Sequence, residues 1–269
     1  MKNWIIWVLA TIITLSAAYY QRTTGPTYPK RAKIDVNGKS YKIKLTRSHG
    51  GDDNATIKFE IPDTSVKANL IFHRFNINEP YDTVKFERKG ALLVATLPHQ
   101  PPAGKLQYFT EFKSKGKSLT IFKDNPVVIR FKGEVPGFIL LPHIFFMFFA
   151  MFLSNIAGIM ALAKKDRFRL YTNLTFCFLI IGGMILGPFV QFFAFGEFWT
   201  GVPYGWDLTD NKTLIAFIFW LIAFVGNLKG KRPYLTILAS VMLLLIYSIP
   251  HSMFGSELNY TTGSIGTGK

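Results

Sequence analysis

Two histidines stand next to prolines near the ends of long apolar segments. Pro142-His143 lies at the start of one segment, and Pro250-His251 lies at the end of the last one. An ionisable residue in a membrane helix is by default a functional candidate. Two imidazoles from different helices can ligate a haem iron axially. We therefore predict that His143 and His251 bind haem b or a transition metal if their helices are neighbours. Two ordinary interfacial histidines are the alternative.

An acidic and aromatic segment, residues 196–212, provides further candidates. They are Trp199, Trp206, Asp207 and Asp210. If the cofactor is a metal rather than haem, Asp207 and Glu257 could complete the ligand set, because carboxylates and imidazoles together bind Zn, Cu or Fe. Each residue also has a structural interpretation. Asp207 precedes an apolar run and is suited to cap a helix, and tryptophans commonly form a belt at the membrane interface. No catalytic residue is predicted.

The bulk composition is that of a membrane protein. The chain has 269 residues, of which 49% are hydrophobic and 26 are phenylalanine. The apolar residues come in blocks, which a soluble domain seldom shows. The formal net charge of +15 suits an anionic membrane surface or an acidic partner, and no nucleic-acid-binding motif is present. The single cysteine excludes an intramolecular disulfide.

Changes in patterning divide the chain into three parts. Residues 1–20 contain a 17-residue apolar run, which predicts a transmembrane anchor or a signal peptide. Residues 21–135 contain about eight runs with period-two alternation, separated by turn sequences such as Asn37-Gly38. Residues 136–269 contain four apolar blocks of membrane-spanning length. These blocks are approximately 138–163, 171–195, 213–228 and 234–251.

This organisation predicts an α+β membrane protein. We expect an N-terminal anchor helix, an immunoglobulin-like β-sandwich over 21–135, and a C-terminal four-helix transmembrane bundle. The loop sequences predict its orientation. Residues 164–169 and 229–232 are strongly basic, whereas 196–212 is acidic. By the positive-inside rule the basic loops are cytoplasmic. The N-terminus is then cytoplasmic, and the β-domain and the C-terminal tail are periplasmic if the membrane is a bacterial inner membrane.

Two stretches carry a resemblance. The run from Trp199 to Lys212 and the ending from Ile249 to Tyr260 are similar to an uncharacterised family of bacterial polytopic inner-membrane proteins with an extracytoplasmic β-domain. The β-domain after a single apolar helix also resembles periplasmic modules of cytochrome-oxidase assembly proteins at the level of architecture. Neither resemblance implies an activity or a functional residue.

The sequence therefore favours an integral membrane subunit or accessory protein of a larger complex, which could be respiratory or redox-active. Its partners would be the lipid bilayer and other proteins of that complex, and not nucleic acid. The alternative is a non-redox structural or assembly protein whose basic β-sandwich binds a partner. A transporter or membrane enzyme is less favoured, because the sequence contains no internal repeat, no nucleotide-binding loop and no catalytic triad.

Overall fold

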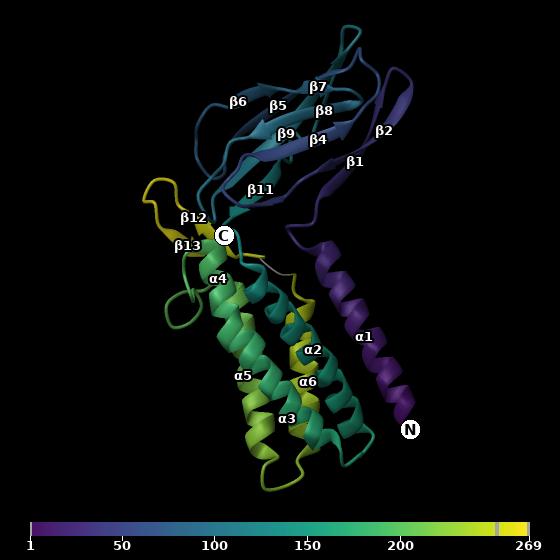
Figure 1. The fold of residues 1–269 in the computed structure, drawn as a ribbon, viewed down its shortest axis with the longest axis vertical. Helices are drawn as coiled ribbons and strands as arrows, with labels where there is room; N and C mark the ends of the chain where they lie inside the picture. Colours follow the sequence, from purple (N-terminus) through teal and green to yellow (C-terminus); the bar gives the residue numbers. More distant parts are fainter. Residues whose placement is uncertain (1, 251–252, 268–269) are drawn as a thin grey trace. The chain divides into compact units, whose positions relative to one another are not determined.

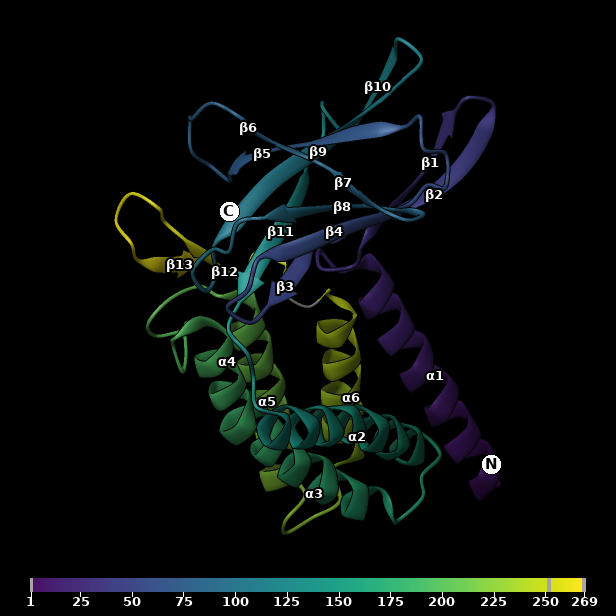
Figure 2. The same cartoon turned by 45° about the horizontal axis from the view of Figure 1, so that its top comes forward.

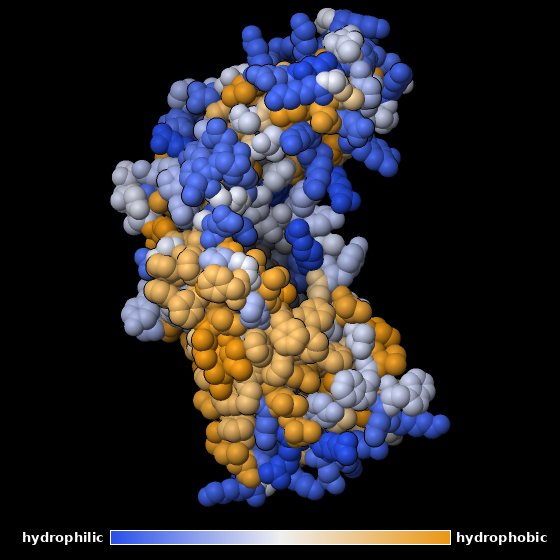
Figure 3. All heavy atoms as spheres, in the orientation of Figure 1, coloured by the Kyte–Doolittle hydropathy of each residue, from blue (hydrophilic) through white to orange (hydrophobic). Residues whose placement is uncertain are grey.

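The chain forms a mixed α+β structure with two compact units. The computed structural model describes residues 2–250 and 253–267 (Figure 1). The helical unit comprises residues 1–26, 135–256 and 266–269, and the β unit comprises residues 27–134 and 257–265. Residues 257–265 thus belong to the β unit although they follow the last helix, a placement that the alternation pattern did not indicate. Hydrophobic side chains gather over the helices, and hydrophilic ones gather over the β unit (Figure 3).

Four helical stretches are apolar and long enough to cross a membrane. Three of them are single helices, namely α1 (Asn3–Thr24), α2 (Gly137–Leu162) and α5 (Leu208–Gly226). The other is one continuous stretch made of α3 (Phe168–Leu179), the π-helical η1 (Ile180–Leu186) and α4 (Gly187–Phe195). The last helix, α6 (Pro233–Ser248), is apolar but has only 16 residues. This is shorter than the ~20 residues that usually cross the hydrocarbon core. The predicted apolar blocks therefore form helices, and the last of them is shorter than expected.

Small and polar residues allow the helices to pack closely. A Cβ atom on Gly158 of α2 would lie 2.4 Å from Ser240 Oγ of α6, so only glycine permits this approach. The Asn155 side chain of α2 donates to Thr14 Oγ1 of α1 at 2.9 Å. Small residues at close contacts and hydrogen bonds between helices are characteristic of helix association in membranes. The first helix is thus joined to the rest of the helical unit by specific contacts.

The two basic loops lie at the same end of the helical unit (Figure 1). Lys231 Nζ lies 2.6 Å from Asp166 Oδ1, and the Arg169 guanidinium donates to Leu228 O at 2.8 Å. These contacts connect the loop between α2 and α3 to the loop between α5 and α6. The segment between α4 and α5 lies at the opposite end, because the continuous stretch of α3, η1 and α4 crosses the unit in one direction and α5 crosses it in the other (Figure 1).

Residues 27–134 of the β unit form three sheets. β1 (Lys30–Val36) pairs with β2 (Lys39–Leu45). The largest sheet has the order β3-β11-β9-β5-β6, with β10 also paired to β9, and the third sheet has the order β4-β8-β7 (Figure 2). The remaining bounds are β3 (Ser48–Gly50), β4 (Ala55–Glu60), β5 (Lys67–Arg74), β6 (Asp82–Lys85), β7 (Glu87–Lys89), β8 (Leu92–Leu97), β9 (Lys105–Ser114), β10 (Lys117–Ile121) and β11 (Val127–Lys132).

The predicted alternating runs coincide with the strands that carry the core. In β4 the burial alternates strictly, with Ile57 and Phe59 buried and the lysine between them exposed. Tyr108 of β9 is fully buried, and its hydroxyl donates to Thr46 O at 2.7 Å. Among β1 to β11, three strands were not among the predicted runs, namely β1, β3 and β7. β3 and β7 have only three residues each, which is too short for a period to be recognised.

Candidate functional site

A buried polar cluster lies at the end of the helical unit where α4 ends and α5 begins. We call it the polar cluster and define it by five buried side chains and Thr200. The members are Gln191, Thr200, Asp207, Asp210, Lys212 and Ser256. They come from α4, from the following loop, from the first turns of α5 and from the segment after α6. Buried polar groups need partners because desolvation costs several kcal/mol when none is present.

Asp210 fixes the loop that precedes its own helix. Its Oδ2 atom accepts hydrogen bonds from the Thr200 amide at 2.6 Å and from Thr200 Oγ1 at 3.1 Å. The neighbouring Asn211 side chain accepts from the Val202 amide at 2.8 Å. Gly201 lies so close to this turn that a Cβ atom there would be 2.8 Å from the Cβ atom of Asp210. The loop is therefore held against α5 by charge-assisted hydrogen bonds to its backbone.

Asp207 caps α5 and joins the segment after α6 to the loop. Its Oδ1 atom accepts from the amides of Thr209 at 2.7 Å and of Asp210 at 3.4 Å, as an N-cap aspartate does. Its Oδ2 atom accepts from Ser256 Oγ at 3.1 Å. The predicted capping role is thus confirmed. In addition, the side-chain amide of Gln191 donates to Ser256 Oγ at 3.3 Å, which brings α4 into the same cluster.

Lys212 brings a positive charge to the polar cluster. Its side chain is only 6% exposed. The ammonium group donates to Ile249 O at 3.1 Å and to Pro250 O at 3.3 Å, where α6 has ended. Such carbonyls at a helix C-terminus have no partner within the helix and carry partial negative charge. Lys212 therefore joins α5 to the end of α6 by hydrogen bonds, and Asp207 likewise joins α5 to Ser256.

The loop that the polar cluster orders presents aromatic side chains on its outer surface. Tyr204 is 84% exposed and Trp206 is 77% exposed, while Phe198 stacks on Phe192 of α4 with ring centroids 4.4 Å apart. Trp199 is more restrained, since its Nε1–H donates to Val202 O at 3.0 Å. We call residues 196–207 the aromatic loop. Thr200 and Asp207 of this loop belong to the polar cluster, whereas the rings of Tyr204 and Trp206 are largely exposed.

His143 lies in the second turn of α2 and contacts η1. Its Nδ1–H donates to Gly182 O at 2.9 Å. A carbonyl partner at Nδ1 fixes the tautomer and leaves the lone pair on Nε2, which is the usual arrangement of a metal-ligating histidine. Gly182 also packs against α2, because a Cβ atom there would be 2.8 Å from the Cβ atom of Phe146. A π-helical segment beside a candidate ligand is notable, since such segments are frequent at functional sites.

Glu257 lies in the β unit, in the short strand β12 (Ser256–Leu258), which pairs with β13 (Ile265–Thr267). Its carboxylate lies 2.5 Å from Lys105 Nζ and accepts from the Asn76 side chain at 2.8 Å. Desolvation lowers the pKa of Lys105, and the Glu257 carboxylate opposes this shift. The ion pair joins the tail directly to β9, and we call these contacts of residues 257–265 the tail clasp.

Tyr260 forms the second half of the tail clasp. Its hydroxyl donates to Lys105 O at 3.0 Å and accepts from the Lys105 amide at 2.9 Å. Burial raises the pKa of this hydroxyl to about 12. The guanidinium of Arg74 lies over the Tyr260 ring at 5.4 Å from the centroid. The tail thus binds both the backbone and the side chains of the β unit.

The predicted ligand residues fall into different places. His251 lies outside the residues that the structure describes. Asp207 and Asp210 share the polar cluster, His143 contacts Gly182, and Glu257 belongs to the tail clasp. Within residues 2–250 and 253–267, the structure contains no group of three or more His, Cys, Asp and Glu side chains arranged to hold a metal ion.

Sequence reasoning did not identify Gln191, Lys212 and Ser256 as cluster members. The signal for Lys212 was present, because it follows Asp210 in the first turns of a helix that is otherwise apolar and suited to enter the membrane. Gln191 and Ser256 are 65 residues apart in sequence, and only the fold brings them together. No protein-family model matches this chain, and no curated protein matches it.

Proposed function

We propose that this chain is an integral membrane accessory or structural subunit of a larger complex, and that the aromatic loop contacts a protein partner. The observation that carries the proposal is the polar cluster beneath that loop. Ordering a loop by burying two carboxylates and an ammonium is costly, and it restrains the backbone that carries Tyr204 and Trp206. The Tyr204 amide donates to Gly201 O at 2.9 Å, and the Asp207 amide donates to Thr200 O at 3.0 Å. Tyrosine and tryptophan are among the residues most enriched at the energetic centres of protein interfaces.

The charge of the β unit supports a second contact with the same complex. Residues 27–134 contain 20 lysines and arginines but only 11 aspartates and glutamates. Such an excess favours association with an acidic surface. We propose that the β unit is an immunoglobulin-like sandwich. Its mostly antiparallel strands and its single extensive core support this assignment, since that architecture often serves in adhesion and assembly rather than catalysis.

We further propose that the helical unit spans a bacterial inner membrane. The two basic loops, which lie at one end of the helices, would face the cytoplasm together with the N-terminus. The aromatic loop, the β unit and the C-terminal tail would then be periplasmic. The four long apolar helices are compatible with this placement. Labelling of single introduced cysteines in intact cells, with Cys177 replaced by serine, would test the orientation.

Replacing both Tyr204 and Trp206 with alanine is expected to abolish co-purification of the partner. Interface aromatic residues contribute on the order of 2 kcal/mol each, so the loss should exceed tenfold in affinity. The measurement is quantitative mass spectrometry of the complex isolated in mild detergent. Trp4 serves as a matched control, because it is 63% exposed but lies at the start of α1, at the opposite end of the helices. An unchanged partner yield from the double variant, or an equal loss in Trp4→Ala, would refute the assignment.

A haem or metal centre at His143 is the second candidate function. The Nδ1–H bond to Gly182 O favours it, because the bond leaves Nε2 available for a ligand. His251 would supply the second imidazole in this proposal. The purified protein should then show a Soret absorption band or bind one equivalent of metal, and His143→Ala should remove the signal. Absence of both signals from wild-type protein purified from its native membrane would exclude this candidate.

A further inference from the structure

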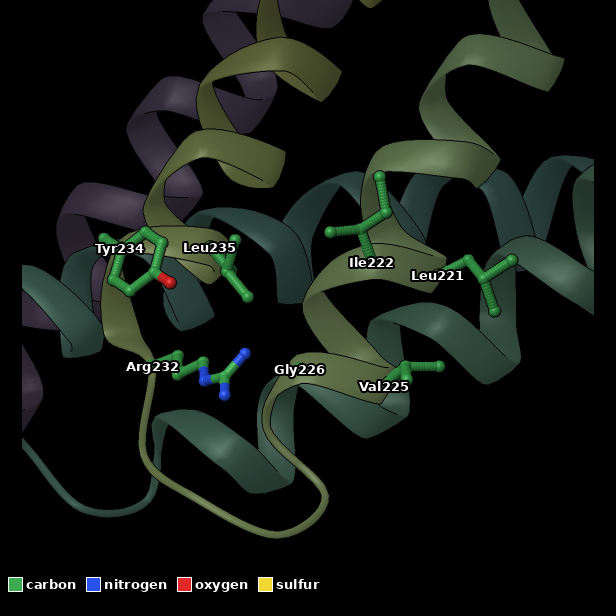
Figure 4. A pocket seen from close by; sticks show the side chains of 7 residues that line it. All are labelled: Leu221, Ile222, Val225, Gly226, Arg232, Tyr234 and Leu235. Carbon is green, nitrogen blue, oxygen red and sulfur yellow. The ribbon is translucent and has the colours of Figure 1, made fainter.

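A groove opens between α5 and α6 at the end of the helical unit that carries the basic loops. Its volume is about 430 Å³, which is within the ~300–1,000 Å³ that is common for small-molecule sites. Figure 4 shows the side chains that line it. They are Leu221, Ile222, Val225, Gly226, Arg232, Tyr234 and Leu235.

The groove is polar at one end and apolar along its length. Arg232 lies where the loop enters α6, whereas Ile222 and Leu221 lie about one turn further into α5 than Val225 (Figure 4). Ile222 is 49% exposed and Val225 is 55% exposed. In a membrane these side chains would face lipid. A charged end near the interface and an apolar wall along the helix match the two parts of a phospholipid, a phosphate and an acyl chain.

The positive end of the groove has a defined structure. The buried side chain of Asn227 accepts from the Arg232 amide at 2.7 Å and donates to Ala223 O at 2.8 Å, so the turn between the two helices is closed. The Arg232 backbone is thereby fixed. Within the described part of the chain, its guanidinium has no ion pair, while the nearby Lys231 is paired with Asp166. The guanidinium can therefore bind an anion with two parallel hydrogen bonds.

Gly226 keeps the groove narrow at its base. A Cβ atom on this residue would lie 2.3 Å from Cδ1 of Leu235, so a larger residue here would displace the Leu235 side chain. The beginning of α6 adds to the positive potential. Its first turn has no acidic residue and no side-chain cap, and the amide groups of such a helix end favour an anion.

From these features we infer that the groove binds an anionic phospholipid, with the phosphate on Arg232 and one acyl chain along Ile222 and Val225. Basic pockets between transmembrane helices are suited to anionic headgroups. This inference does not depend on the aromatic loop or on a protein partner. It requires only that the helical unit lies in a bilayer, for which the four long apolar helices provide support.

Native mass spectrometry of the full-length protein with dioleoyl phosphatidylglycerol and dioleoyl phosphatidylcholine in equal amounts tests the inference. Wild-type protein should retain phosphatidylglycerol preferentially. Arg232→Gln should weaken that binding about fivefold, the change that corresponds to ~1 kcal/mol for one basic residue at an anionic surface. The matched control is Lys229→Gln, which removes a charge from the same loop but does not line the groove. Its binding should change less than twofold.

A second pair of variants tests the acyl-chain part of the groove without altering charge. Ile222→Trp should fill the groove and reduce binding of phosphatidylglycerol by a similar factor. Leu245→Trp places the same bulk on an exposed position of α6 outside the groove and should have no effect. The inference is overturned if Arg232→Gln and Lys229→Gln lose equal affinity, if Ile222→Trp binds as wild type does, or if inorganic phosphate displaces the lipid completely.

Discussion

Replacement of Asp207 with alanine is expected to unfold the aromatic loop locally and to destabilise the helical unit by about 3 kcal/mol. The loss of an N-cap costs ~1 kcal/mol, and each buried donor left without an acceptor costs ~1–3 kcal/mol. In this variant the Thr209 and Asp210 amides lose their side-chain acceptor, and Ser256 Oγ loses its bond to Asp207. The effect should therefore exceed that of an ordinary cap substitution.

Hydrogen exchange of the full-length protein in detergent is the appropriate measurement. In Asp207→Ala the amides of Thr200 and Val202 should exchange faster, although their own acceptors are on Asp210 and Asn211. Asp207→Asn is the control, since an asparagine can still cap the helix, and it should retain most of the protection. If Asp207→Ala leaves the loop amides as protected as in the wild type, the polar cluster does not order the aromatic loop.

Replacement of Glu257 with alanine is expected to destabilise the β unit by about 3 kcal/mol. The Lys105 and Glu257 side chains are only 16% and 17% exposed. Removing one partner of a buried ion pair leaves the other charge without compensation, which typically costs ~3–5 kcal/mol. The lower end of that range applies because neither side chain is fully buried. The tail would retain the Tyr260 contacts and the hydrogen bond from the Leu258 amide to Ala103 O at 3.1 Å.

The amides of β9 should report this change through hydrogen exchange. Tryptophan fluorescence would not, because all five tryptophans lie outside residues 27–134 and 257–265. Lys113→Ala is the matched control, since it breaks the ion pair between Lys113 and Glu111. The Lys113 side chain in this pair is 54% exposed. Exposed pairs contribute ~0–1 kcal/mol. In addition, Glu257→Ala combined with Lys105→Met should be more stable than Glu257→Ala alone. If the double variant is less stable than Glu257→Ala, the Lys105 ammonium has another source of compensation in the single variant, and this explanation of the loss is wrong.

The apolar helices and most of the β-strands could be predicted from sequence because both depend on local periodicity. A block such as 138–163 is continuous and apolar, and α2 spans Gly137–Leu162. The alternation in Thr56-Ile57-Lys58-Phe59 likewise places alternate residues on one face, as β4 shows. The cap at Asp207 was also predictable, because capping depends only on the next three residues.

The polar cluster and the tail clasp were decided by the tertiary structure alone. Gln191 meets Ser256, and Lys105 meets Glu257 across 152 residues, through contacts that no local pattern encodes. Glu257 was a candidate metal ligand in the sequence because a carboxylate shortly after His251 suits that chemistry, whereas in the fold it pairs with a lysine of the β unit. Sequence by itself determined which residues enter helices and strands, since the hydrophobic period sets those. Only the fold determined which polar residues meet. A buried polar group needs a hydrogen-bond partner, and that partner can come from any part of the chain that packs beside it.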